Sequence, residues 1–169
     1  EDSENEEDDG ASDDTERAVE VNVAGDGYDQ EYISSAGIRY KHFKQIKGSY
    51  SSNPYWSGTI RSDGCGPTSV AILASGLTSY NYTPADTAAQ MNATYGYTSA
   101  ENLKGEMDSL GMPAEIIYSP SAQEIQDNLR NGKVMLVSVN SNTIFTGGSH
   151  IMAIVDINTQ GQVYICNPS

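Results

Sequence analysis

Acidic residues are concentrated at the start of the chain, and this uneven distribution limits what each part can fold into. Of the 23 Asp and Glu residues among 169, 14 lie in residues 1–31, together with a single basic residue, whereas the rest of the chain is nearly neutral. A segment of such charge density cannot bury enough apolar surface to offset the entropy of ordering. We therefore expect an acidic, disordered tail over residues 1–31 and one folded domain over residues 32–169.

The composition also argues against two classes of partner. A nearly neutral domain behind an anionic tail repels phosphate backbones, so we expect no nucleic-acid partner. No run approaches the roughly 18 apolar residues of a membrane helix, so we expect no transmembrane segment. The sequence begins at Glu1 without a Met, which is compatible with a removed export signal.

Helix start and stop signals predict four short helices in the first part of the domain. Pro67 precedes apolar residues at helical spacing, and Gly76 is expected to end this first helix. Capping residues at Thr83, Ser99 and Ser121 indicate the starts of the other three.

Strands are predicted late in the chain. The apolar runs over 134–139 and 149–157 are the strongest candidates, and 114–118 is a weaker one. A turn over 158–161 leads into a strand over 162–166, which predicts an antiparallel hairpin. Helices first and adjacent strands afterwards indicate an α+β fold, with the helices packed on an antiparallel sheet.

Cys65 is the best candidate for a nucleophile. It lies between two glycines, directly before the helix predicted near Pro67. The unpaired amides and the macrodipole at a helix N-terminus favour an anion, so we expect a stabilised thiolate with a lowered pKa. Two structural alternatives remain open: a disulfide with Cys166, and a zinc site that combines both cysteines with His42 and His150.

The predicted hairpin supplies a base and a residue that orients it. His150 lies at the start of the strand over 149–157, and Asn167 follows the strand over 162–166, so the hairpin brings the two together. A thiol nucleophile needs a base such as imidazole. The amide oxygen of Asn167 can accept the Nδ1 proton of the ring and fix it. Each residue alone is also compatible with a purely structural role.

Three blocks of sequence, in this order, resemble a known family. They are Gly-Cys65-Gly-Pro-Thr-Ser, Gly-Ser-His150 before an apolar strand, and Val-Tyr-Ile-Cys-Asn167-Pro. Over about residues 40–169 the chain is similar to the bacteriocin-processing (double-glycine) peptidase-like family of papain-like cysteine peptidases. The resemblance implies a papain-like cysteine peptidase fold, with Cys65 as nucleophile, His150 as general base and then acid, and Asn167 as the third residue. Family members often carry Asp at that third place, so Asn167 is a departure.

The resemblance also implies an oxyanion hole. Gln45 lies upstream of the cysteine, where the family usually has a glutamine for this role. A neutral amide donor stabilises a developing oxyanion, and the backbone amide of Cys65 is its expected companion.

We therefore expect a thiol peptidase that hydrolyses peptide bonds of a peptide or protein substrate through a thioester, with no cofactor and no metal. Alternatives on the same fold are a cell-wall amidase or an acyl transferase, whose substrate would include cell-wall peptide. A third alternative is a non-catalytic peptide-binding module, with a groove lined by Tyr50, Tyr55 and Trp56. The absent Met, the tail and the habits of the family favour an extracellular or cell-surface location on a bacterium.

Overall fold

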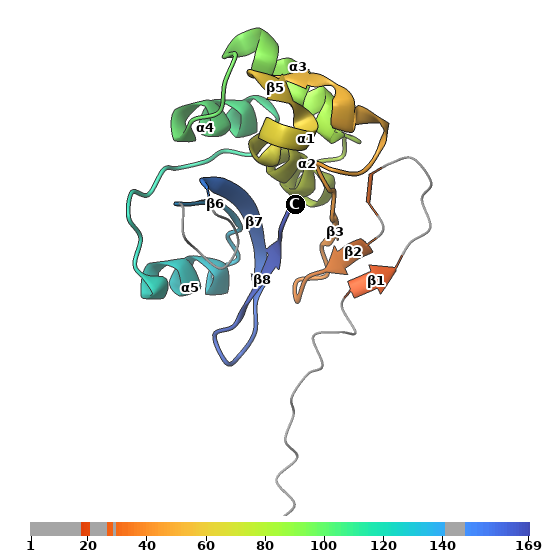
Figure 1. Ribbon diagram of the computed structural model, residues 1–169. Helices are drawn as coiled ribbons and strands as arrows, with labels where there is room; N and C mark the ends of the chain where they lie inside the picture. Colours follow the sequence, from red (N-terminus) through yellow and green to blue (C-terminus); the bar gives the residue numbers. More distant parts are fainter. Residues whose placement is uncertain (1–17, 21–26, 29, 141–147) are drawn as a thin grey trace, which may run out of the picture.

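The main sheet is formed late in the chain by three antiparallel strands (Figure 1). In this computed structural model, β7 (His150–Ile157) lies between β6 (Met135–Val139) and β8 (Val163–Cys166). Strand β7 is almost wholly buried, which accounts for its continuous apolar sequence. The strands predicted over 134–139 and 149–157 and the hairpin that follows are confirmed.

The structure describes residues 18–20, 27–28, 30–140 and 148–169. Most of the segment for which we predicted an acidic tail, residues 1–31, lies outside these residues. The later part of that segment contributes to a second antiparallel sheet, in which β2 (Gln30–Ile33) lies between β1 (Ala18–Glu20) and β3 (Arg39–Lys41).

A buried carboxylate connects the two sheets. Asp156 of β7 accepts hydrogen bonds from the hydroxyl of Tyr32 at 2.8 Å and from the amide and hydroxyl of Ser35 at 2.8 and 2.6 Å. Burial by itself would raise the pKa of Asp156, but these hydrogen bonds, with one from the amide of Ile157, hold it below its usual range. The carboxylate is therefore charged and well bonded inside the protein.

The four predicted helices are all present, and the α+β class is confirmed. They are α2 (Cys65–Leu77), α3 (Pro84–Thr94), α4 (Ala100–Ser109) and α5 (Ala122–Arg130). The predicted N-caps at Thr83, Ser99 and Ser121 each accept a backbone hydrogen bond. Helix α2 differs from the prediction at both ends. It begins at Cys65, and it runs past Gly76, against which the ring of Tyr40 packs.

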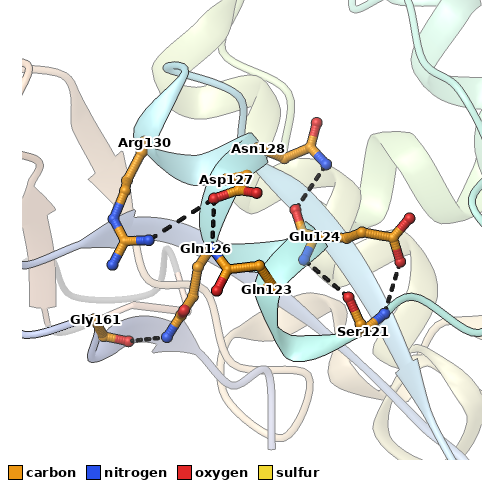
Figure 2. A network of polar contacts seen from close by, with 8 residues as sticks. All are labelled: Ser121, Gln123, Glu124, Gln126, Asp127, Asn128, Arg130 and Gly161. Atoms are coloured by element: carbon orange, nitrogen blue, oxygen red, sulfur yellow. Dashed lines mark hydrogen bonds and ion pairs between the residues drawn. The ribbon is translucent and has the colours of Figure 1, made fainter.

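Helix α5 is fixed at its start and along its side (Figure 2). The hydroxyl of Ser121 accepts from the amide of Glu124 at 3.1 Å, and the carboxylate of Glu124 accepts from the amide of Ser121 at 2.8 Å. The side-chain amide of Gln126 donates to the carbonyl of Gly161 at 3.0 Å, in the turn between β7 and β8. The helix is thereby tied to the hairpin that carries His150.

Between β3 and α2 the structure forms only short elements: a 3-10 helix (Ser49–Ser52), β4 (Pro54–Tyr55), β5 (Gly58–Thr59) and α1 (Ile60–Asp63). The strand predicted over 114–118 is wrong. Within the described part of the chain this segment joins no sheet. The carboxylate of Asp108 instead accepts the amide hydrogen of Ala114 at 2.9 Å.

The core is centred on α2, which packs against β7 on one side and α3 on another. Figure 1 shows α1 to α4 gathered in one half of the domain, and both three-stranded sheets with α5 in the other. None of the helices in the described ranges is long and apolar enough to span a membrane.

One ionisable side chain lies inside the half formed by the helices. Glu106 of α4 is 1 % exposed, and its Oε1 has no hydrogen-bond partner within the described residues. Burial raises the pKa of this carboxyl to about 7.

Candidate active site

Cys65 is the first residue of α2, and a tight junction between two helices places it there. A capping box between Thr59 and Ser62 starts α1, and the amide of Gly64 donates to the carbonyl of Ile60 at 2.9 Å as that helix ends. A Cβ atom at Gly64 would lie 2.4 Å from that same carbonyl oxygen, so only glycine allows α2 to begin at the next residue. The thiol therefore lies at a helix N-terminus, as predicted, and is partly exposed.

The acidity of this thiol differs from the prediction. Burial raises the pKa of Cys65, and the nearby carboxylate of Asp63 adds to the rise. The backbone amides of Ile151, Gly66 and Cys65 itself lower it, but less than burial raises it. The predicted lowering of the pKa is thus not found: the pKa of this thiol is raised, so formation of the thiolate depends on a neighbouring base.

The packing of α2 on β7 brings Cys65 next to the start of that strand. The hydroxyl of Ser69, one helical turn after Cys65, donates to the buried carbonyl of Ile151 at 3.2 Å. Among the backbone groups that lower the pKa of Cys65, the amide of Ile151 has the largest effect. Since Ile151 follows His150 directly, the thiol lies beside the start of the strand that carries the imidazole.

The side chains of His150 and Asn167 are in contact, as the hairpin predicted. His150 is 6 % exposed, and its Nε2 lies 2.8 Å from Oδ1 of Asn167. We expected Nδ1 to make this bond, and the structure corrects that expectation, because the ring presents its Nε2 edge to the end of β8. The amide of Ser169 also donates to Oδ1 at 3.0 Å, which orients the carboxamide.

This contact determines which ring nitrogen can act as a base. A carboxamide oxygen only accepts hydrogen bonds, so Nε2 of His150 carries the proton. In the neutral ring Nδ1 then holds the lone pair. The hydroxyl of Ser169 lies 3.1 Å from the same Nε2 and adds a second polar neighbour at that edge. His150 is therefore held as the tautomer that can accept a proton at Nδ1.

The segment that carries Asn167 is held by contacts that the sequence did not predict. Nε2 of His42 and Nζ of Lys44 both lie 2.8 Å from the backbone carbonyl oxygen of Asn167. Nζ of Lys44 also donates to the carbonyl of Ser169 at 2.9 Å, and the amide of Gln45 donates to the carbonyl of Pro168 at 2.7 Å. We call residues 42–45 the brace. No spacing in the sequence indicates these contacts, because their partners lie more than 120 positions apart.

Gln45, predicted as an oxyanion-hole donor, lies beside α1. It is 6 % exposed, and its Nε2 donates to the carbonyl of Arg61 at 2.9 Å, four residues before Cys65. Its Oε1 is buried without a partner within the described residues. The structure thus places Gln45 against the helix that leads into Cys65, with one hydrogen of its amide group committed to α1.

The structure bears on the two alternatives for the cysteines. Cys65 and Cys166 are both free thiols, so the disulfide is not formed. Cys166 is fully buried, and burial raises its pKa to about 12. In the described part of the chain, His, Cys, Asp and Glu side chains form no group of three or more that could hold a metal ion.

Comparison with known protein families gives a match. A model of the family described as Peptidase_C39 like family matches residues 37–169, which include Gln45, Cys65, His150 and Asn167. No match was found among curated proteins or among solved structures.

Proposed function

The chain belongs to the Peptidase_C39 like family, and on that premise we propose that it is a cysteine peptidase with a papain-like fold that hydrolyses peptides or proteins. Cys65 is the nucleophile, His150 the base and acid, and Asn167 the residue that orients the imidazole. No step requires a metal or a cofactor.

Burial raises the pKa of the Cys65 thiol, so the thiol needs a base to become the nucleophile. Nδ1 of His150 takes the thiol proton as the sulfur attacks the peptide carbonyl carbon. The imidazolium is stabilised at Nε2, where the Oδ1 atom of Asn167 accepts a hydrogen bond at 2.8 Å.

The oxyanion of the tetrahedral intermediate faces the start of α2. The amide of Cys65 belongs to the first turn of that helix, where amides have no intrahelical partner. The second hydrogen of the Gln45 side-chain amide is the other donor. The C–N bond then breaks, His150 protonates the leaving amine, and a water activated by His150 hydrolyses the thioester to regenerate the thiol.

The observation that carries this proposal is the contact between His150 and Asn167 on the strand that packs against Cys65. Two contacts coincide here: the carboxamide of Asn167 fixes Nε2 of His150, and the backbone amide of Ile151, the next residue, lies at the Cys65 thiol. A purely structural histidine would require neither contact. That combination supports a nucleophile with its base.

The experiment compares three proteins on one pool of peptides, with products identified by mass spectrometry. We expect the wild type and Cys166→Ala to cleave the pool, and Cys65→Ala to lose at least about 10³-fold in rate. Cys166→Ala is the matched control, because it removes the other thiol from the core. Cleavage that persists in Cys65→Ala would refute the proposal.

A parallel incubation with peptidoglycan tests the alternative substrates. Fragments released from peptidoglycan alone would assign the site to cell-wall amide bonds. Binding of intact peptides with no turnover by the wild type would assign the domain to a non-catalytic role.

A further inference from the structure

Two aromatic side chains are exposed side by side near the start of α2. Trp56 is 56 % exposed and Tyr97 is 48 % exposed, and their ring centroids lie 6.2 Å apart. We call these two residues the aromatic pair. The sequence suggested an aromatic surface of Tyr50, Tyr55 and Trp56, but Tyr50 and Tyr55 are buried, so only Trp56 of that group faces outward.

The backbone of the aromatic pair is fixed although both rings are exposed. Trp56 lies in the turn between β4 and β5 with a φ of 51°, in the left-handed region that bulky residues rarely adopt. Oδ1 of Asn92 accepts its amide hydrogen at 3.0 Å, and Nδ2 of Asn92 donates to the carbonyl of Pro54 at 2.9 Å. Nδ2 of Asn102 similarly donates to the carbonyl of Tyr97 at 3.2 Å. The turn thus holds a tryptophan outward where glycine or asparagine would be less strained.

A partly buried contact links the aromatic pair to the residue that follows the nucleophile. The hydroxyl groups of Tyr55 and Thr98, the neighbours of Trp56 and Tyr97 in the sequence, are hydrogen-bonded to each other. A Cβ atom on Gly66 would lie 2.8 Å from the side chain of Thr98. Thr98 therefore packs directly against the residue that follows Cys65.

A second contact connects the turn between β4 and β5 to the residues that precede Cys65. A Cβ atom on Gly58 of β5 would lie 2.6 Å from a carboxylate oxygen of Asp63. That carboxylate acts electrostatically on the Cys65 thiol. The hairpin that presents Trp56 thus packs against Asp63, two residues before the nucleophile, and is linked through Thr98 to Gly66, the residue after it.

We propose that Trp56 and Tyr97 form a substrate subsite that binds an apolar side chain of the peptide, a short distance along the chain from the bond that Cys65 attacks. The proposal rests on the proposed peptidase function. The exposed ring faces lose contact with water when an apolar side chain covers them, which gives binding energy, and their fixed backbone reduces the entropy lost on binding. Thr98 and the turn between β4 and β5 connect the aromatic pair to the residues around Cys65, so in this proposal a peptide whose carbonyl lies at Cys65 extends over the pair.

Trp56 is the only tryptophan in the chain, so its fluorescence reports on this subsite directly. The probe is a set of peptides of equal length in which one position carries Phe, Leu or Ile, and a matched set in which that position carries Ala. They are titrated into the Cys65→Ala protein, which binds without cleaving. We expect a blue shift with the apolar set and little change with the Ala set. A shift produced only by peptidoglycan oligosaccharides would overturn the proposal in favour of a sugar platform.

Cleavage rates give an independent readout. We expect Trp56→Gly to lower the ratio of kcat/KM for the apolar set over the Ala set about tenfold. Glycine tolerates the φ of the turn, so this variant removes the ring without adding strain. The matched control is Tyr80→Ala. Tyr80 is 64 % exposed and lies beside Tyr82, beyond the C-terminal end of α2, so its loss should leave the ratio unchanged.

The two readouts separate failure of this proposal from failure of the peptidase function. If the wild type cleaves both sets with the same preference as Trp56→Gly, the subsite is wrong while the peptidase function stands. If no peptide is cleaved, the peptidase function is wrong, and the fluorescence titration still decides whether the aromatic pair binds apolar side chains.

Discussion

Glu106 provides a prediction that depends on burial and not on the proposed reaction. Burial raises the pKa of its carboxyl from an ordinary 4.5 to about 7. The folded protein therefore keeps this proton up to about pH 7, whereas the unfolded chain releases it above about pH 4.5. The unfolded state thus binds fewer protons between these values, so the free energy of unfolding falls as the pH rises through this window and is constant above it, as far as this group is concerned.

The pKa difference sets the size of the effect. One pKa unit corresponds to about 1.4 kcal/mol, so the full pKa difference between the folded and the unfolded state would lower the free energy of unfolding by about 3 kcal/mol. Local relaxation and water penetration raise the effective dielectric around buried charges. We therefore expect a loss of about 1–2 kcal/mol between about pH 5 and about pH 8. Glu106→Gln removes the titrating carboxyl, so this contribution to the pH dependence of the free energy of unfolding should disappear. Any effect of the buried amide on the free energy of unfolding itself is the same at both pH values.

The measurement is urea unfolding followed by circular dichroism at both pH values. The wild type is compared with Glu106→Gln and with Glu115→Gln, a matched change at an exposed glutamate. Other groups that titrate in this range contribute equally to all three proteins and cancel in the difference. If Glu106→Gln loses as much stability as the wild type between the two pH values, the reasoning from burial is refuted.

Three further predictions concern the site and the sheets. Asn167→Ala should lower kcat about 100-fold with little change in KM, because His150 loses the hydrogen-bond acceptor at Nε2. Asn167→Asp keeps an acceptor there and should retain most of the wild-type rate. Equal kcat values for the wild type and Asn167→Ala in steady-state kinetics on a cleaved peptide would show that the contact has no role. Iodoacetamide should label Cys65 in the native protein at a rate that increases with pH, since burial raises the pKa of its thiol. It should label Cys166 only after the protein is unfolded. Peptide mapping that finds Cys166 labelled first would contradict the greater burial of that thiol. Asp156→Asn should lower the free energy of unfolding by about 1–2 kcal/mol at neutral pH. The lowered pKa of Asp156 means that this stabilisation is present above about pH 4 and is lost as the pH falls further; a variant as stable as the wild type in urea at neutral pH would rule it out.

Local signals in the sequence predicted the elements that local interactions stabilise. The N-caps at Thr83, Ser99 and Ser121 act within one helical turn, so a short window of sequence contains all the groups involved. The hairpin of β7 and β8 depends on one turn, and it brought His150 and Asn167 together as expected. The α+β class followed from the order of these elements.

Features that depend on distant partners were not predictable in the same way. Residues 114–118 have a strand-like composition, but a strand forms only where another strand can pair with it. The helix N-terminus at Cys65 suggested a thiolate with a lowered pKa. The pKa of this thiol is instead dominated by burial, which depends on parts of the chain that are distant in the sequence. The ring edge that His150 presents to Asn167 and the contacts of Lys44 likewise depend on the tertiary fold.

The contacts between the brace and residues 167–169 set the order in which the proposed machinery can be completed during synthesis. Residues 42–45 leave the ribosome before the segment that orients His150, which is made more than 120 residues later. Closing a loop of this length is entropically costly until the intervening helices and sheet have formed. A nascent chain therefore carries an accessible cysteine but no oriented base, and the proposed proteolytic activity arises only once the whole domain has been synthesised and folded.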